Sequence, residues 1–511
     1  MFRRVLIANR GEVAIRVART CLKMGIEPIG VYSDADVRSL HRRFMQDDVL
    51  IGPAAPSESY LSIERIVKAA EDMECEAVHP GYGFLAENLA IVRRCEEEGL
   101  VFIGPPSAPM ALSGDKIASR KAMAAAGVPV TRGVDRVLAS ADEAREVAES
   151  LGYPVMFKAS GGGGGIGMAR VDSPSEVPEV FERARSVSLA NFGSPDLFVE
   201  KYVERARHIE IQVFIDAQGH GVCLGERECS VQRRHQKLIE ETPSPAMTEE
   251  RREEIGSTAV RGLQSVGYRN AGTVEFLFAD GEFHFNEVNA RLQVEHPITE
   301  AVTGLDLVEF QIRLAAGEPL PVDRANVELK GHAMECRINA EDPRAHFAPG
   351  PGRILEYREP HGPGVRVDSG VAEGSVVSEH YDPLIAKLVV HTEARASTIG
   401  AMERALREFR IEGVPTTIPF HREMIRTPEF VKGNLWTTMV NDLGVVDRIG
   451  GPRVPEEHVS ALAIALAANP HVVERFAGRQ RLHRPPLSKW AAAGRDALKG
   501  GRDAVSVHHQ R

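Results

Sequence analysis

The N-terminal part of the chain alternates between short apolar runs and stretches with helical spacing. Val5–Ala8 is typical of a buried strand, and Gly11–Met24 carries apolar residues at the spacing of one helix face. Three further strand-like runs follow, each after a helical stretch: Ile29–Tyr32, Ala77–His79 and Val101–Gly104. This alternation predicts a doubly wound α/β domain, in which a parallel sheet has helices on both faces, ending near Ser113.

The pattern changes in the middle of the chain. A strand at Val155–Lys158 leads into the glycine-rich run Ser160–Met168, in which six of nine residues are glycine. From His208 onward, strand patterns predict an antiparallel sheet: Ile209–Val213, Gly272–Phe278 and Glu282–Glu287. After residue 352 a mixed α and β region extends to about residue 444, and a further segment follows.

Composition narrows the class of protein. The 511 residues include 43% hydrophobic and 26% charged residues, as in globular proteins, and no apolar run approaches the roughly 18 residues of a membrane span. The apolar stretch at the N-terminus is too short for a secretory signal. The six cysteines form no C-x-x-C pair, which suggests a reducing, cytoplasmic location. A net charge of −10 argues against nucleic-acid binding.

The glycine-rich run is a candidate phosphate-binding loop. Glycines allow successive backbone N–H groups to approach phosphate oxygens, and Lys158 just before the run supplies a cation. The chain has no Gly-Lys dipeptide, which excludes a P-loop, and so many glycines match almost any dinucleotide-binding pattern. A flexible surface turn is the alternative.

Two glutamates, Glu275 and Glu287, lie on strands joined around Ala279–Glu282. A two-residue Asp-Gly turn would place them on opposite faces of the hairpin, whereas a three-residue loop would place them on the same face. On one face they would repel each other unless a cation such as Mg²⁺ lay between them, with Asn289 continuing that face. A solvated sheet face with unrelated acids is the alternative.

A third group follows this hairpin. Arg291, Gln293 and Glu295 alternate, so that an extended segment would point them the same way, where they could bind a small oxyanion and accept its proton. Polar alternation at a sheet edge is the alternative. The run Gln232–Lys237 and the pair Cys336–Arg337 could likewise be a solvated face or line an anionic site. Serine hydrolase and zincin motifs are absent from the sequence.

Taken together, these segments resemble biotin carboxylase, the ATP-grasp component of biotin-dependent carboxylases. The resemblance covers about Met1–Gly444 in the family's order and is carried by these motifs: Ile7–Glu12, His79–Phe84, Lys158–Ser160 with the glycine run, Gln232–Lys237, Asn289–Pro297 and Glu335–Asp342. It implies an N-terminal Rossmann-like domain (1–113), an ATP-grasp domain (114–330) with a mobile lid (about 131–203), a mixed α+β C-terminal domain (331–446) and a basic appendage (447–511).

The resemblance also implies two half-reactions. ATP and bicarbonate form carboxyphosphate, which then carboxylates biotin on a carrier protein. The residues implied for ATP are Lys116, Lys158, Gly163, Gly164, Gly165, Glu200, Lys201, His208, Gln232 and His235. Those implied for Mg²⁺, with Mn²⁺ as an alternative, are Glu275, Glu287 and Asn289. Bicarbonate is assigned to Lys237, Arg291, Gln293 and the Val294 backbone, with Glu295 as base, and biotin to Arg337, which stabilises its enolate, and Tyr82.

Two departures from the family pattern matter. Ile166 follows the five glycines where the family often has arginine, which removes a cation from the lid. The chain also lacks the Ala-Met-Lys-Met segment of biotin carriers, so that we expect a stand-alone subunit that needs a separate carrier and a carboxyltransferase. The resemblance suggests a homodimer and leaves acetyl-CoA, propionyl-CoA and pyruvate open as final acceptors.

Two other functions remain as alternatives. Another ATP-grasp ligase would share Lys116, Lys158 and the two hairpin glutamates without needing Arg337, and a weakened scaffold subunit would need no turnover at all. The C-terminal segment carries nine Lys or Arg against two Asp between Arg475 and Arg511. With the apolar stretch Val459–Ala468, this charge predicts a docking segment for a carboxyltransferase or carrier.

Overall fold

β1 (Arg4–Ile7) lies at the centre of a five-stranded sheet in which all neighbouring strands are parallel, in the order β3-β2-β1-β4-β5. The structure is a computed structural model that describes residues 1–450 except 162–164, 166 and 323–326. Val5 and Ile7 pack in one apolar cluster with α1, and Leu6 in another with α2 and α3. The doubly wound parallel sheet predicted for this region is confirmed. The other elements of this part are β2 (Glu27–Ser33), β3 (Asp47–Gly52), β4 (Ala77–His79), β5 (Val101–Phe102), α1 (Gly11–Lys23), α2 (Ile63–Asp72), α3 (Leu89–Glu98) and α4 (Ser107–Ser113).

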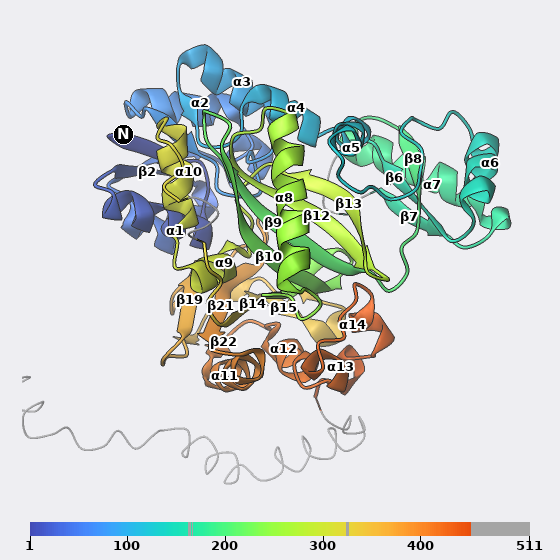
Figure 1. Ribbon diagram of the computed structural model, residues 1–511. Helices are drawn as coiled ribbons and strands as arrows, with labels where there is room; N and C mark the ends of the chain where they lie inside the picture. The colour runs from blue at the N-terminus through green and yellow to red at the C-terminus, as the bar shows by residue number, and fades with distance from the viewer. Residues whose placement is uncertain (162–164, 166, 323–326, 451–511) are drawn as a thin grey trace, which may run out of the picture. The chain divides into compact units, whose positions relative to one another are not determined.

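A smaller antiparallel sheet, in the order β7-β6-β8, carries the glycine-rich run between two of its strands. Val155 and Phe157 of β6 pack on α6 and α7, whereas Met156 and Lys158 on the other face line a cavity. Figure 1 shows these elements grouped together. Their bounds, with the helix that precedes them, are α5 (Lys116–Ala125), α6 (Ala141–Leu151), β6 (Val155–Ala159), β7 (Met168–Val171), α7 (Val177–Phe192) and β8 (Leu197–Lys201).

An eight-stranded antiparallel sheet, in the order β13-β12-β9-β10-β11-β14-β21-β19, forms the rest of the framework. It runs without a break across the domain boundary expected at residue 330, because β11 pairs with β14. α8 packs on β9 and β10, as Figure 1 shows. The bounds are β9 (Arg207–Ile215), β10 (Gly221–Arg233), β11 (Gln236–Thr242), α8 (Glu249–Ser265), β12 (Asn270–Ala279), β13 (Glu282–Asn289), α9 (His296–Thr303), α10 (Leu307–Ala315), β14 (His332–Asn339), β19 (Val365–Ser369) and β21 (Leu384–Thr392).

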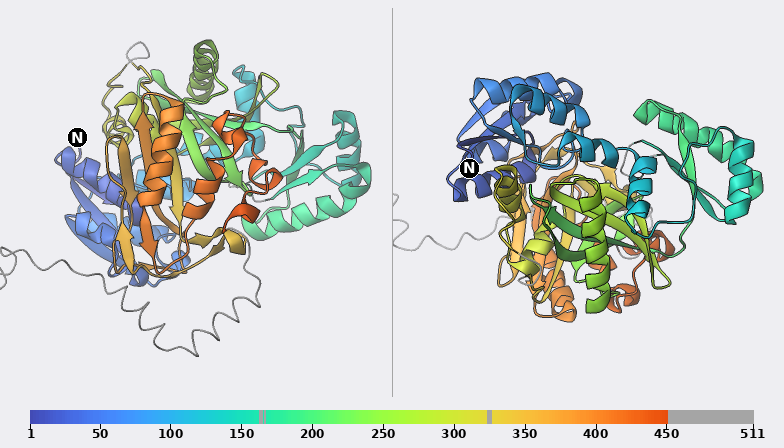
Figure 2. Two further views of the ribbon diagram at one scale, coloured as in Figure 1. Left: turned by 90° about the horizontal axis from the view of Figure 1, so that it is seen from below. Right: turned by 45° about the horizontal axis from the view of Figure 1, so that its top comes forward.

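The C-terminal part adds helices and short strands to this sheet. Figure 2 shows α11 lying along the strands β14 and β21, with which it is in contact. The elements are β15 (Glu341–Asp342), β16 (Ala348–Pro349), β17 (Gly352–Arg353), β18 (Glu356–Arg358), β20 (Val376–Val377), α11 (Arg395–Glu408), β22 (Arg410–Glu412), α12 (Ile418–Met424), α13 (Pro428–Val431) and α14 (Met439–Asp442). The mixed α+β character expected here is confirmed.

The hairpin of β12 and β13 corrects one expectation. Its loop is the two-residue turn Asp280-Gly281, since Ala279 pairs with Glu282, and both turn residues have positive φ. Such a turn was expected to place Glu275 and Glu287 on opposite faces. They lie directly opposite each other instead, because Asn286 is an extra residue between the pairs Phe276–Phe285 and Glu275–Glu287. A bulge of this kind shifts the register by one residue.

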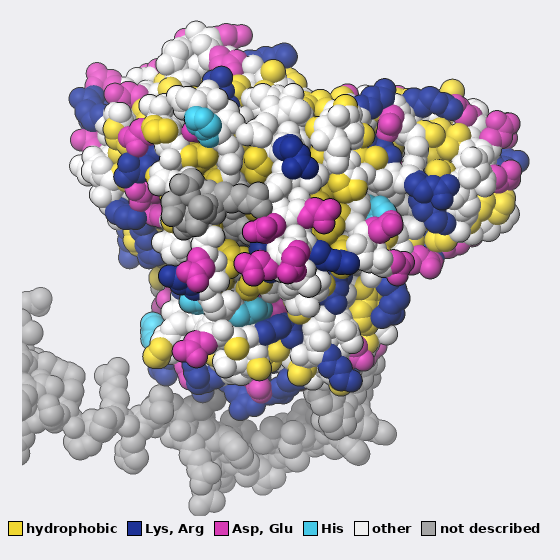
Figure 3. Space-filling model, in the orientation of Figure 1, with side chains coloured by type: hydrophobic (Ala, Val, Ile, Leu, Met, Phe, Trp, Pro, Cys, Tyr) yellow, Lys and Arg dark blue, Asp and Glu magenta, His cyan; other side chains and the backbone are white. Residues whose placement is uncertain are grey.

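The surface carries charged side chains of both signs. The face in Figure 3 carries basic and acidic side chains side by side, and acidic ones gather in the area where Figure 1 shows α8. Among the described residues, every helix is too short or too polar to cross a membrane.

Candidate active site

A cavity of about 440 Å³ collects most of the predicted site residues. It lies against the small sheet of β6 and β8, the larger sheet from β9 to β13, and the segment that follows β13. The predicted residues that line it are Lys116, Lys158, Gly165, Glu200, Lys201, His208, Gln232, His235, Lys237, Glu275, Glu287, Asn289, Arg291, Gln293, Val294 and Arg337. Glu295 and Tyr82 are not part of its lining, and Gly163, Gly164 and Ile166 lie outside the described residues.

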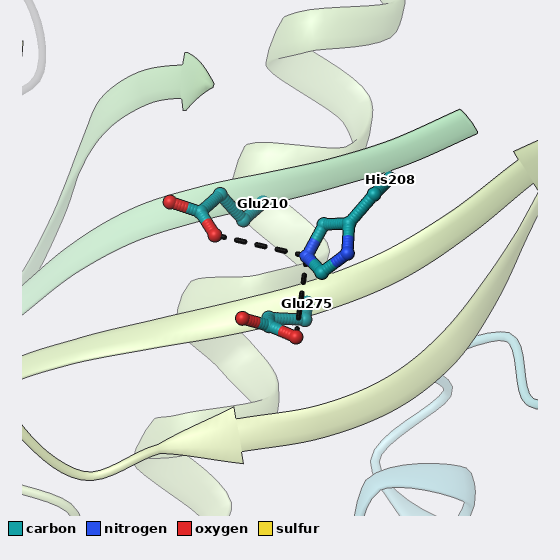
Figure 4. A group of neighbouring side chains, drawn as sticks. All are labelled: His208, Glu210 and Glu275. Carbon is teal, nitrogen blue, oxygen red and sulfur yellow. Dashed lines mark ion pairs between the residues drawn. The ribbon is translucent and has the colours of Figure 1, made fainter. Parts of the chain in front are cut away.

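The centre of the site is a group of buried charges on adjacent strands. His208 and Glu210 are two residues apart on β9, so they share a face, and Glu210 pairs directly with Glu275 of β12. Figure 4 shows the His208 ring pointing to both carboxylates, with Nε2 3.2 Å from Glu275 Oε2 and 3.7 Å from Glu210 Oε2. Burial alone would lower the pKa of His208, but these carboxylates outweigh it and raise that pKa. Glu210 was not predicted, although its spacing from His208 was the available signal.

Lys237 joins this group to Glu295. Its Nζ donates to Glu210, to Glu275 Oε1 at 2.8 Å and to Glu295 Oε1 at 2.7 Å. Burial alone would lower the pKa of Lys237, but the three carboxylates raise it well above its ordinary value. The ammonium therefore offsets part of the negative charge of Glu210, Glu275 and Glu295.

Glu295 is fully buried between two cations. Its second oxygen accepts a hydrogen bond from an Arg337 terminal nitrogen at 3.0 Å, and Arg337 Nε donates to Glu240 Oε1 at 2.6 Å. Burial alone would raise the pKa of Glu295, but Lys237 and Arg337 hold it well below the ordinary value. Glu295 is therefore a carboxylate at neutral pH, the form that can accept a proton.

The segment after β13 presents donors to the cavity. Arg291 is held by Glu87 of the N-terminal part, whose Oε2 accepts from its Nε at 2.8 Å, and by Asn289 Oδ1 at 3.1 Å. Gln293 is 3% exposed, and its Nε2 is buried without a partner among the described residues. An arginine and an unpaired amide N–H beside a cavity suit a small anion. Glu87 was missed because it lies 204 residues from Arg291.

Three more lysines line the cavity. Lys158 Nζ lies 2.5 Å from Glu200 Oε2 and donates to Asn286 Oδ1 at 3.2 Å, while Lys116 Nζ lies 3.4 Å from Glu287. The Lys201 side chain turns to the backbone, donating to two carbonyl oxygens at 2.9 Å. A Cβ on Gly165 would lie 2.6 Å from the His235 ring, so only glycine allows this close approach.

The donor set on the hairpin fits a magnesium ion. Glu275 and Glu287 face each other, and Asn289 Nδ2 donates to Glu275 Oε1 at 2.8 Å. Two carboxylates and a carboxamide beside the cavity offer oxygen ligands of the kind Mg²⁺ prefers. Lys237 and Lys116 balance the charges of the two glutamates.

The fold and site define an ATP-grasp enzyme, in which two sheets hold lysines and carboxylates on either side of one cavity. In agreement, residues 115–323 match the family model for the carbamoyl-phosphate synthase L chain ATP binding domain. Residues 1–110 and 335–442 match the models for the biotin carboxylase N-terminal and C-terminal domains. The chain belongs to the biotin carboxylase family and is the biotin carboxylase subunit of a biotin-dependent carboxylase.

Relatives and solved structures agree with this assignment. The chain is 49% identical to a pyruvate carboxylase subunit of Methanothermobacter thermautotrophicus, covering 92% of this chain and 99% of the relative. It is 48% identical to biotin carboxylase 2 of Bacillus subtilis, covering 86% and 98%. Two structures each have a TM-score of 0.85 at 43% identity: a biotin carboxylase–βγ-ATP complex from Campylobacter jejuni (86% and 99% covered) and the biotin carboxylase domain dimer of Hydrogenobacter thermophilus 2-oxoglutarate carboxylase with MgADP, ADP and bicarbonate (87% and 98%).

Proposed function

We propose that this cavity binds MgATP and bicarbonate together, forms carboxyphosphate and passes the carboxyl group to biotin on a separate carrier protein. The observation that carries the proposal is the Glu295 carboxylate held between Lys237 and Arg337, beside Arg291 and Gln293. The Hydrogenobacter relative was solved with MgADP and bicarbonate, which supports the same two substrates here.

At the nucleotide end, Lys116 and Lys158 would bind the phosphate groups, because phosphoryl transfer is driven by positioning and by cations on the phosphate oxygens. Glu275, Glu287 and Asn289 would hold Mg²⁺, which neutralises phosphate charge when bound. Gly165 and the rest of the glycine run would cover the phosphates as part of a lid over about 131–203. The remaining nucleotide contacts are assigned to Glu200, Lys201, His208, Gln232 and His235.

At the bicarbonate end, Arg291, Lys237, Gln293 and the Val294 N–H would bind the anion. Glu295 would take the bicarbonate proton while the oxygen attacks the γ-phosphorus of ATP, and ADP would leave. Carboxyphosphate would then break down to CO₂ and phosphate; the phosphate would take the proton from biotin N1′, and N1′ would attack the carbon of CO₂. Tyr82, which lies outside the cavity lining, is assigned to the biotin ring. Arg337 would stabilise the negative charge that develops on the biotin ureido oxygen, since Glu240 and Glu295 already fix its guanidinium group.

Partners follow from the same chemistry. A carrier must bring biotin to the cavity, and a carboxyltransferase must take the carboxyl group to its acceptor. The Methanothermobacter relative is named as one subunit of its enzyme, which supports a complex with separate subunits. The Hydrogenobacter relative is described as a domain dimer, which supports a homodimer here.

The test is ADP release by the purified chain with MgATP and bicarbonate, with and without free biotin. We expect stimulation by biotin, and we expect Arg337→Ala and Glu295→Ala each to lower the stimulated rate by at least about 100-fold. Arg404→Ala, which removes an exposed arginine of α11, is the matched control and should keep the rate. Turnover that is indifferent to biotin would instead favour another ATP-grasp ligase, and no turnover would favour a scaffold subunit.

A further inference from the structure

The turn that carries Gln293, Val294 and Glu295 is held by two basic side chains that are fully buried and do not line the cavity. The first is His296, whose Nδ1 lies 2.8 Å from the Gln293 carbonyl oxygen. Because a carbonyl can only accept, Nδ1 must carry the proton. Burial, together with the nearby charges of Lys387 and Arg16, lowers the pKa of His296 well below its ordinary value, so the ring is the neutral Nδ1–H tautomer.

This hydrogen bond fixes the direction of the next N–H. In a trans peptide the carbonyl of one residue and the N–H of the following residue point to opposite sides. Because the Gln293 carbonyl oxygen accepts a hydrogen bond from His296, the Val294 N–H of the same peptide must point away from the His296 ring. The Val294 N–H donates to no group in the described part of the chain, and Val294 lines the cavity.

The second side chain is Lys387 of β21. Its Nζ donates to the Val294 carbonyl oxygen at 3.1 Å and lies 3.1 Å from Glu12 Oε2, at the start of α1. Lys387 also lies over the Tyr82 ring, 5.6 Å from its centroid, and pairs across the strands with Arg337. Its ammonium therefore ties the peptide after Val294 to the N-terminal part, directly beside the proposed biotin site.

We propose that His296 and Lys387 are positioning residues for bicarbonate: they fix the two peptides on either side of Val294, so that its N–H is preset as a donor to the anion. The inference deepens the proposed function and rests on it. The geometry is that of an oxyanion-binding backbone amide, which is effective because its direction is fixed before the anion arrives. Neither side chain touches a substrate.

The test of Lys387 uses a variant of Glu12, its ion-pair partner, as the control. Lys387→Met removes the donor but leaves Glu12 buried alone, whereas Lys387→Met combined with Glu12→Gln leaves no buried charge in this pair. Glu12→Gln alone breaks the ion pair and keeps the bond to Val294. We expect the KM for bicarbonate to rise at least about fivefold in Lys387→Met and in the double variant, with the KM for MgATP within about twofold, and Glu12→Gln to leave both unchanged.

His296 is tested by rescue. An asparagine places an amide N–H where the imidazole has Nδ1–H, whereas leucine has a similar volume and no donor. We expect His296→Leu to raise the KM for bicarbonate at least about fivefold and His296→Asn to restore most of the wild-type value. Thermal unfolding of each variant checks that it is folded.

The outcomes separate the inference from the proposed function. If wild-type ADP release does not depend on bicarbonate, the proposed function is wrong. If it does depend on bicarbonate but the double variant and His296→Leu keep the wild-type KM, only the positioning role is wrong. A rise in both KM values by the same factor would show a general structural effect and would also overturn the positioning role.

Discussion

At the scale of single residues, two buried glutamates beside Arg337 differ in how strongly they hold a proton, because their partners differ. Glu240 and Glu335 lie directly opposite each other on β11 and β14, and both are 0% exposed. Glu240 accepts the Arg337 Nε hydrogen bond, whereas both Glu335 oxygens lack a hydrogen-bond partner among the described residues. Burial raises the pKa of Glu335 well above its ordinary value, and the neighbouring Glu240 adds to this. Burial also raises the pKa of Glu240, to about 7, although Arg337 opposes this rise. Two facing carboxylates repel at low dielectric, so Glu335, which lacks such a hydrogen-bonded cation, holds its proton more strongly than Glu240.

This protonation predicts a pH-dependent effect of Glu335→Gln on stability. Above the ordinary glutamate pKa the folded wild type keeps a proton on Glu335 that the unfolded chain has lost, so wild-type stability falls as pH rises towards the folded pKa. Glutamine removes this dependence. The free energy of unfolding of Glu335→Gln minus that of the wild type should therefore increase from pH 5 to pH 8, by up to about 1.4 kcal/mol per pH unit.

The measurement is urea unfolding at several pH values, from which the slope of this difference is taken. A constant cost of burying the amide does not change the slope. Glu97→Gln, at a side chain that is 68% exposed, controls for the change in net charge. A flat difference across this range would mean that Glu335 is ionised in the folded protein.

At the scale of elements, the β12–β13 hairpin brings the two hairpin glutamates together by combining a tight turn with a bulge. The turn needs Gly281 at φ +83°, and the bulge at Asn286 then restores a common face for Glu275 and Glu287. The sequence predicted the hairpin and left a two-residue Asp-Gly turn and a three-residue loop as alternatives. It could not predict the bulge, because an extra residue in one strand leaves no mark in the period-two pattern until its partner strand is known.

Two glycine-to-alanine changes should therefore have opposite signs. Gly281→Ala puts a Cβ on a left-handed turn residue and should cost about 1–2 kcal/mol of unfolding free energy. Gly400→Ala lies within α11, where a Cβ meets nothing within 4 Å, and should add up to about 1 kcal/mol. Urea midpoints measure both, and equal signs would contradict the assigned backbone geometry.

At the scale of the whole molecule, the parallel sheet and the antiparallel strands could be predicted because periodicity is a local signal. Most cavity residues were named only through the family resemblance, which contiguous motifs carry. Two residues that support the site were missed because they come from distant segments. Lys387 lies 93 residues from Val294, and Glu87 reaches Arg291 from the N-terminal part. The continuous sheet across residue 330 was missed for the same reason, since strand pairing between β11 and β14 has no local pattern.

The chain beyond residue 450, which lies outside the described residues, leads to the last prediction. Every described residue that lines the cavity lies at or before Asn441, so removal of the residues after Pro452 should leave carboxylation of free biotin within about twofold of the full chain. The match to the Methanothermobacter pyruvate carboxylase subunit covers 92% of the chain, more than residues 1–450 can supply, whereas the match to biotin carboxylase 2 covers 86%. Part of the C-terminal segment is therefore shared with one component of a multi-subunit enzyme, and its basic character suits an acidic partner. We expect the truncated chain to co-purify less with the carboxyltransferase and the carrier than the full chain does. This loss should be larger than the loss that added salt causes for the full chain. Unchanged assembly would instead place the docking surface within residues 1–450.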